Sequence, residues 1–200
     1  MNDPPKMVHR STEHDKNASL AIINELIGFY RSQGRHTESV RVSEQALNLC
    51  RDEYILGSVS HATTLLNAAT AYRFAGQSQK AMELFEQTEQ IYQEKVPLND
   101  DRYAGLLNNM SAAYADLGQL DKAAEYLLRA AAIMDAHPAH VIDSGVTHAN
   151  LAALYFKMQN YYGAKSHIAI ACDYLKDRPE AASKYEQFKA MQELFDKLPG

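Results

Sequence analysis

Small and apolar residues return along this 200-residue chain at intervals of about 42 positions. Four tyrosines, spaced 42, 42 and 41 residues apart, each lie four residues before one of four reference residues, here called the turn positions. The tyrosines are Tyr30, Tyr72, Tyr114 and Tyr155, and the turn positions are Gly34, Gly76, Gly118 and Gln159. Small residues recur five and twelve positions after each turn position: Ser39, Ala81, Ala123 and Ala164, then Ala46, Thr88, Ala130 and Ala171. The sequence therefore predicts a stack of four helical hairpins, numbered below as repeats one to four.

Prolines mark the ends of the predicted repeats. Pro97, Pro138 and Pro179 lie 41 residues apart and interrupt the chain after the second helix of repeats two, three and four. The predicted array spans residues 18–176, with repeats at about 18–52, 57–95, 100–136 and 140–176. Residues 1–17 are polar, and we expect them either to be disordered or to extend the first helix. Asp100 and Asp121 are the predicted N-caps of the helices that follow them.

Residues 178–198 are predicted to form one more helix. An apolar stripe on this helix consists of Tyr185, Phe188, Met191 and Phe195, while the charged side chains that face away are Glu186, Lys189, Glu193 and Lys197. We expect the helix to cap the last repeat by covering the apolar face of its second helix. The alternative is half of a fifth repeat that a second molecule completes, which would make the protein a homo-oligomer through its C-terminal helix.

The repeats resemble the tetratricopeptide repeat. Repeat two shows the pattern of large and small residues most fully, with Leu65, Ala68, Ala69, Tyr72, Gly76, Ala81, Phe85 and Thr88. The period of about 42 residues and the run NLAALY at Asn150–Tyr155 are similar to the kinesin-light-chain-like subtype, although the chain contains no tryptophan. The resemblance implies an all-α, right-handed superhelical solenoid. It also implies a non-catalytic protein-interaction adaptor that binds a partner peptide or helix in a concave groove.

Charge and hydropathy argue against two other classes of partner. The net charge is −5 and the basic residues form no stripe that would match a phosphate backbone, so we expect no nucleic-acid partner. No apolar run is long enough to cross a bilayer, and the first residues do not read as a signal peptide. We therefore expect a cytoplasmic protein without a membrane partner.

Reactive side chains are few and scattered. Cys50 and Cys172 lie in different repeats and are expected to be reduced thiols. His148 takes a place that is apolar in the other repeats, so we expect a packed, neutral side chain there. We find no catalytic motif, no phosphate-binding loop and no set of metal ligands in the sequence. We therefore expect no enzyme activity, no cofactor and no metal.

One series of polar residues stands out on the predicted first helices. Asn67, Asn109 and Asn150 each lie nine residues before the turn position, where repeat one has Glu25. Asparagine is less favourable than alanine inside a helix by roughly half a kcal/mol, so its recurrence needs a reason. In proteins that this chain resembles, this position lines the groove and its amides hold the backbone of a bound peptide. The alternative is that the amides link neighbouring helices or belong only to the repeat consensus.

Other residues on the same helical face complete the predicted groove. They are Thr70, Arg73, Phe74, Asp116, Phe156 and Lys157. The two phenylalanines could instead be packed between repeats. Related domains that bind chaperone tails have lysine four residues before the asparagine series, and this chain has Ala21, Thr63, Gly105 and Val146 there. We therefore expect a protein or peptide partner other than a chaperone tail. A regulatory sensor of a short signalling peptide is the alternative function.

Overall fold

The computed structural model describes residues 13–198, and this part of the chain is helical without any strand. Its α-helices are α1 (Glu13–Ser32), α2 (His36–Leu49), α3 (Val59–Phe74), α4 (Ser78–Lys95), α5 (Asp101–Asp116), α6 (Leu120–Asp135), α7 (Val141–Lys157), α8 (Tyr161–Leu175) and α9 (Ala182–Asp196). Two short 3-10 helices, η1 (Pro138–His140) and η2 (Pro179–Ala181), precede α7 and α9. Of the predicted N-terminal segment, residues 13–17 belong to α1 and residues 1–12 lie outside the described residues. None of the helices described is long and apolar enough to cross a membrane.

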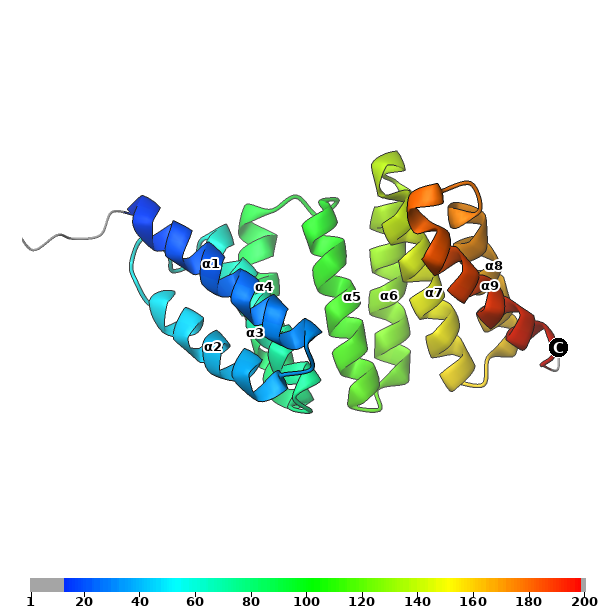
Figure 1. The fold of residues 1–200 in the computed structure, drawn as a ribbon, viewed down its shortest axis with the longest axis horizontal. Coiled ribbons are helices and arrows are strands. Elements are labelled where there is room, and N and C mark those ends of the chain that lie inside the picture. The colour runs from blue at the N-terminus through cyan, green and yellow to red at the C-terminus, as the bar shows by residue number, and fades with distance from the viewer. Residues whose placement is uncertain (1–12, 199–200) are drawn as a thin grey trace, which may run out of the picture.

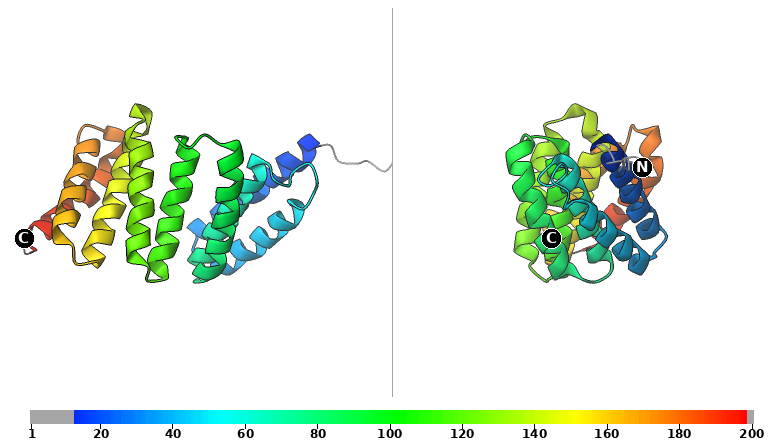
Figure 2. Two further views of the ribbon diagram at one scale, coloured as in Figure 1. Left: turned by 180° about the vertical axis from the view of Figure 1, so that it is seen from behind. Right: turned by 90° about the vertical axis from the view of Figure 1, so that its left-hand side faces the viewer.

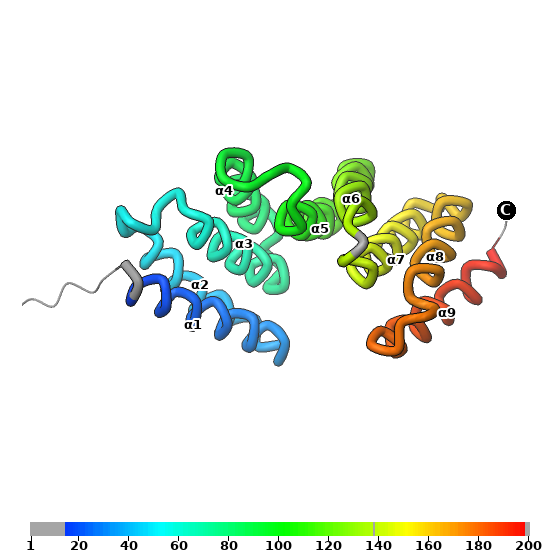
Figure 3. The backbone as a smooth tube through the Cα atoms, turned by 90° about the horizontal axis from the view of Figure 1, so that it is seen from above, coloured from blue at the N-terminus to red at the C-terminus, as the bar shows by residue number. Residues whose placement is uncertain are grey.

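The helices stack as four hairpins along one axis (Figure 1). In each hairpin we call the first helix A (α1, α3, α5 or α7) and the second helix B (α2, α4, α6 or α8). Helix A of repeats two to four packs against its own helix B and against helix B of the preceding repeat. Seen from above, the stack forms an arc with α4 and α6 on its outer side and α3, α5 and α7 on its inner side (Figure 3). The expected all-α solenoid is confirmed.

A residue in the left-handed conformation joins the two helices of every repeat. The turn positions Gly34, Gly76, Gly118 and Gln159 have φ angles of 69°, 76°, 76° and 60°. In each turn the N–H of the next residue donates to the carbonyl of the recurring tyrosine, at 2.9 Å. The N–H of the turn residue itself donates to the carbonyl three positions earlier, at 2.9–3.2 Å. These two bonds end helix A as a Schellman motif, and they confirm that Gln159 is equivalent to the three glycines.

Helices A and B approach closely at the small residues of the repeat. The residues five and twelve positions after the turn are fully buried in all four repeats. In repeat one the hydroxyl of Ser39 on helix B donates to the carbonyl of Ile27 on helix A at 2.9 Å. In repeat three the direction is reversed, because the hydroxyl of Ser111 on helix A donates to the carbonyl of Ala123 on helix B at 2.7 Å. Small side chains at this contact let the two backbones come near enough for such bonds.

One of the two predicted N-caps is correct and the other is wrong. The Asp100 carboxylate accepts a hydrogen bond from the N–H of Arg102 at 2.9 Å and caps α5. Asp121 does not cap α6, whose N-cap is Gln119 without a side-chain hydrogen bond. The Schellman turn leaves only one residue between Gly118 and α6, so Asp121 already lies in the first turn of that helix. Its charge there still favours the positive end of the helix dipole.

The C-terminal helix α9 closes the stack (Figure 2, left). Phe195 is buried in one apolar cluster with residues of α7 and α8, and Phe188 and Met191 pack against that cluster. The four charged side chains predicted to face away from the stripe, Glu186, Lys189, Glu193 and Lys197, are exposed. The helix starts at Ala182 instead of residue 178, because Pro179 and the two residues after it form η2.

Replacing Ala123 by Leu should destabilise the protein. Ala123 has no exposed surface and lies where α5 and α6 meet, so a larger side chain must push the helices apart. We expect the free energy of unfolding to fall by about 1–3 kcal/mol and the melting temperature to fall by several degrees. Thermal denaturation followed by circular dichroism measures both. The control Ala169→Leu changes an exposed alanine of α8 and should leave the melting temperature nearly unchanged; equal melting of the two variants would contradict the assignment.

Replacing Gln159 by Gly should stabilise the protein. A residue with a Cβ atom is strained in the left-handed region, and Gln159 is the only residue between 13 and 198 other than glycine that has a positive φ. Relief of that strain exceeds the extra flexibility that glycine gives the unfolded chain, so we expect a net gain of about 0.5–1 kcal/mol. The matched variant Gly118→Gln should lose a similar amount. Chemical denaturation of both variants measures the two changes, and a loss of stability in Gln159→Gly would sink the explanation.

Candidate functional site

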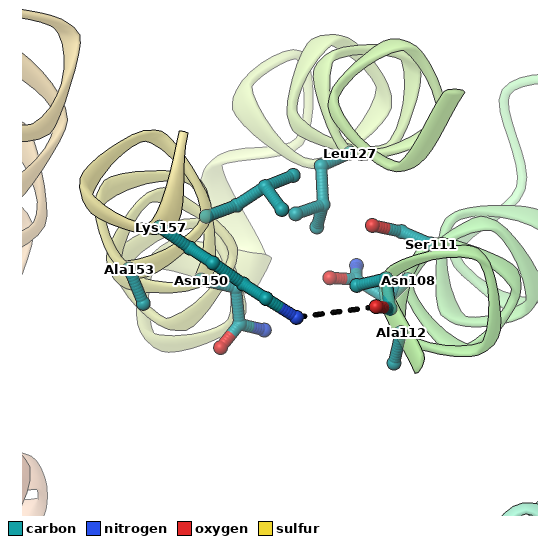
Figure 4. Close-up of a pocket in the computed structure, with 9 residues that line it drawn as sticks. Asn108, Ser111, Ala112, Leu127, Asn150, Ala153 and Lys157 are labelled. Atoms are coloured by element: carbon teal, nitrogen blue, oxygen red, sulfur yellow. Dashed lines mark hydrogen bonds between the residues drawn. The ribbon is translucent and has the colours of Figure 1, made fainter. Parts of the chain in front are cut away.

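Neighbouring A helices of repeats three and four enclose a cleft of about 250 Å³. Figure 4 shows its residues converging from α5 and α7, with Leu127 of α6 at the back. Apolar and small side chains predominate in its lining. The lining residues are Asn108, Ser111, Ala112, Ala115, Leu127, Asn150, Ala153, Leu154 and Lys157. The cleft is therefore suited to an apolar or small side chain of a ligand whose polar groups stay near the opening.

A second cleft, of about 230 Å³, lies between the A helices of repeats one and two. It is more polar than the first. Its lining residues are Asn17, Leu20, Ala21, Asn24, Glu25, Ser60, Thr63 and Asn67. Both clefts run between consecutive A helices, the second along their N-terminal halves and the first along their C-terminal halves.

The three asparagines of the predicted series have different surroundings. Asn67 and Asn150 each line one of the two clefts, and their side chains make no hydrogen bond within residues 13–198. Asn109 instead donates from Nδ2 to the carbonyl of Gly105 in its own helix at 2.9 Å. Its Oδ1 lies 3.5 Å from the hydroxyl of Thr70, which donates at 2.8 Å to the carbonyl of Leu66. Asn109 is thus bonded within the protein, while Asn67 and Asn150 keep free amides.

A second pair of asparagines, one position earlier, was missed by the sequence analysis. Asn24 and Asn108 lie ten residues before their turn positions and donate from Nδ2 to Thr64 and Thr147 of the following repeat, at 3.0 and 3.2 Å. The Oδ1 atoms of both asparagines are buried without a hydrogen-bond partner in the described part of the chain. The signal was available, since the spacing from asparagine to threonine is about 40 residues in both cases. These amides tie repeat one to two and repeat three to four.

Predicted groove residues at the C-terminal ends of the A helices pair with one another. Arg73 Nη1 and Asp116 Oδ2 lie 3.2 Å apart across repeats two and three. The Arg73 guanidinium also stacks on Phe74, with 4.5 Å between its carbon and the ring centre. Phe74 is half exposed and stacks with His36 of α2 at 5.8 Å. This part of the predicted site is therefore held in place by the protein itself.

Arg31 lies at the same position of repeat one as Arg73 does in repeat two, and it has no acidic partner among residues 13–198. Its Nη1 is buried without a hydrogen bond, and the guanidinium makes no ion pair with any residue in 13–198. Burial, and then the positive charge of Arg73, lower the pKa of Arg31. The two groups leave an excess of positive charge at this end of the groove.

The last two predicted residues, Phe156 and Lys157, lie at the C-terminal end of α7. Lys157 Nζ donates to the carbonyl of Ala115 at 3.2 Å and so reaches across the first cleft (Figure 4). Phe156 stacks in parallel with Phe195 of α9, with ring centres 5.0 Å apart, and is 40% exposed. One ring face of Phe156 therefore packs while part of the side chain remains at the surface, and its contribution to the groove stays a prediction.

A chain of hydrogen bonds joins α6, α7 and α8 beside the groove helices. Asp135 accepts from the hydroxyl of Tyr174 at 2.9 Å and from Nε2 of His148 at 3.1 Å. The Nδ1 atoms of His148 and His167 lie 2.9 Å apart, within hydrogen-bond distance. His148 is buried, as expected. No group of three or more histidine, cysteine or acidic side chains converges on a metal position within the described residues.

Comparison with known proteins shows to which family these helical repeats belong. Two family models, both described as "Tetratricopeptide repeat", match residues 19–94 and 104–134 and together cover more than half of the chain. The chain therefore belongs to the tetratricopeptide repeat family, as predicted. A search of curated proteins finds no match. Repeats of this family generally mediate protein–protein interactions, and such proteins are typically non-catalytic adaptors.

Solved structures share the arrangement of the repeats. BtubC (BKLC) from P. vanneervenii is 17% identical, with a TM-score of 0.79 over 92% of this chain and 74% of that chain. A putative kinesin light chain with nearly identical TPR-like repeats from Podosopora anserina is 21% identical, with a TM-score of 0.67 over 91% of this chain and 99% of that chain. A substituted variant of that putative kinesin light chain gives the same TM-score, over 91% of this chain and 98% of that chain. The fold is thus that of kinesin-light-chain-like repeats.

Acid should destabilise the protein through His167. Burial, and then the neighbouring His148, lower the pKa of His167 below its value in the unfolded chain, about 6.5. The unfolded state therefore binds a proton more readily, and the stability present above pH 6.5 should decline as the pH falls below that value. We expect wild-type protein to lose more melting temperature between about pH 7.5 and pH 5.5 than His167→Gln does. Burial also lowers the pKa of His61, but both proteins contain His61, so its effect does not change the difference between them. The same dependence of melting temperature on pH in both proteins would refute the role of His167.

Proposed function

We propose that the protein is a non-catalytic adaptor whose concave groove binds a segment of a partner protein. The proposal rests on one observation: two of the three predicted asparagines, Asn67 and Asn150, line clefts between consecutive A helices with amides that the described protein does not use. A free amide offers one acceptor and two donors, which match the C=O and N–H groups of a peptide backbone. A partner segment laid along the groove would thereby exchange water for protein hydrogen bonds.

The two ends of the groove favour side chains of different kinds. The cleft between α5 and α7 has Leu127 and Leu154 at its base, so an apolar side chain would be buried there at a gain of about 25 cal/mol per Å². At the other end of the groove, Arg31 has no carboxylate partner within residues 13–198. An acidic side chain of the partner placed near Arg31 and Arg73 would offset the excess positive charge.

The closing experiment selects ligands and then asks where they bind. Peptides that bind the wild-type protein would be selected from a random displayed library, and their affinities for purified variants measured by calorimetry. Asn67→Ala combined with Asn150→Ala should weaken binding by about 5- to 150-fold, or about 1–3 kcal/mol, since backbone groups of the peptide lose their partners. The free protein should melt at the same temperature or slightly higher, because alanine favours the helix.

The control replaces an asparagine outside the groove. Asn48→Ala changes an exposed residue of α2 on helix B, and it should leave peptide affinity unchanged. If the peptides bind the double variant with the same affinity as the wild type, the binding site does not include Asn67 and Asn150. A loss of more than about 1 kcal/mol of stability in the double variant, with affinity intact, would make these asparagines structural.

A further inference from the structure

The helix at the N-terminal end of the stack exposes a face that every later repeat buries. Ile22, Leu26 and Phe29 of α1 lie twelve, eight and five residues before their turn position and are 69%, 38% and 54% exposed. The equivalent residues of the three later A helices are buried, with at most 8% of their surface exposed. Those equivalents are Thr64, Ala68 and Ala71, then Leu106, Met110 and Ala113, then Thr147, Leu151 and Leu154.

The interior of the stack shows what normally covers these positions. In repeat four, Leu151 and Leu154 pack on the face of α6 formed by Ala124, Leu127 and Ala131. In repeats two to four, helix B of the preceding repeat lies against helix A in this way. The cover is thus an α-helix that presents small and apolar side chains at spacings of three and four residues. Since α1 has Leu26 and Phe29 where α7 has Leu151 and Leu154, it offers a surface of the same kind.

The two ends of the stack differ. At the C-terminal end, α9 packs on α8 as the helix A of a fifth repeat would. Earlier A helices have apolar residues on the side that faces their own helix B, such as Leu65, Ala69 and Tyr72 in α3. The equivalent residues of α9 are Lys189, Glu193 and Asp196, and all three are exposed. A charged face cannot receive the apolar face of α1 without burying charges, so head-to-tail stacking of two molecules is disfavoured.

We propose that the exposed face of α1 docks an amphipathic α-helix of a partner protein, in the place that helix B occupies between repeats. The docked helix runs antiparallel to α1, as α6 does to α7. Its contact face is apolar where it covers Ile22, Leu26 and Phe29, and Glu25, the one exposed charged side chain of α1 between Asn17 and Ser32, borders that contact. Small residues on that face accommodate Phe29, just as Ala124 and Ala131 of α6 accommodate the leucines of α7. This surface is separate from the groove residues proposed above.

The test uses the whole protein and a helix of known fit. A synthetic peptide with the sequence of α6 (Leu120–Asp135) serves as the probe, because α6 already covers the equivalent face of α7. Labelled peptide should bind the wild-type chain saturably in an anisotropy titration. The variant Leu26→Glu should weaken binding at least about tenfold, since it places a charge in the apolar contact. Leu26 is at the surface and Glu is a good helix former, so the variant should fold and melt normally.

Two controls make the result specific. Leu194→Glu changes an exposed leucine of α9 at the opposite end of the stack and should bind the probe as wild type does. A peptide carrying the change Leu127→Glu should fail to bind the wild-type chain. Absence of saturable binding up to about 1 mM, or equal binding by Leu26→Glu, overturns the proposal. So does a wild-type dimer in sedimentation that Leu26→Glu converts to monomer, because the face would then be occupied by a second copy of the chain.

Discussion

The close contact between helices A and B at fully buried small residues is the constraint on which the structure depends. A left-handed residue reverses the chain, and the residues five and twelve positions later then fit against helix A without a gap. Because this turn and this contact are the same in every repeat, the hairpins have nearly one shape, and stacking them produces a regular arc. The regular stacking brings the A helices to the inner side of the arc, where consecutive helices form the clefts.

The position on helix A and the neighbouring side chains together decide which asparagines bond within the protein and which stay free. Successive helical residues point about 100° apart, so asparagines at adjacent positions face different surroundings. All four asparagines line the clefts, but Asn24 and Asn108 donate to threonines of the next repeat, whereas the amides of Asn67 and Asn150 make no hydrogen bond within residues 13–198. The helices that must hold together thus also carry the amides that can bind a partner. The walls of the proposed groove are the helices whose contacts hold the solenoid together.

Because the contacts between repeats are alike, the two end helices of the stack can be compared with the helices inside it. Inside the array each A helix is covered by the preceding helix B, so the interior defines the surface that an end helix leaves open. The C-terminal end is covered by α9, whose outer side is charged. Helix α1, by contrast, keeps large apolar residues at the positions of the stacking contact. The two ends of this chain therefore have opposite chemistry even though they arise from the same repeat.

The sequence by itself determined the repeat, the turns and the small residues of the contact, including the equivalence of Gln159 with the glycines, because these features lie at fixed offsets within one hairpin. Local spacing also predicted the N-cap at Asp100 correctly, but the predicted N-cap at Asp121 is wrong. The tight turn leaves only Gln119 between Gly118 and α6, so Asp121 lies inside the helix. Only the tertiary structure separated Asn109 from Asn67 and Asn150, revealed the Asn24–Thr64 bond and showed Arg31 without an acidic partner among residues 13–198. Each of these depends on which groups surround a side chain in the folded stack, and offsets within one repeat do not determine those surroundings.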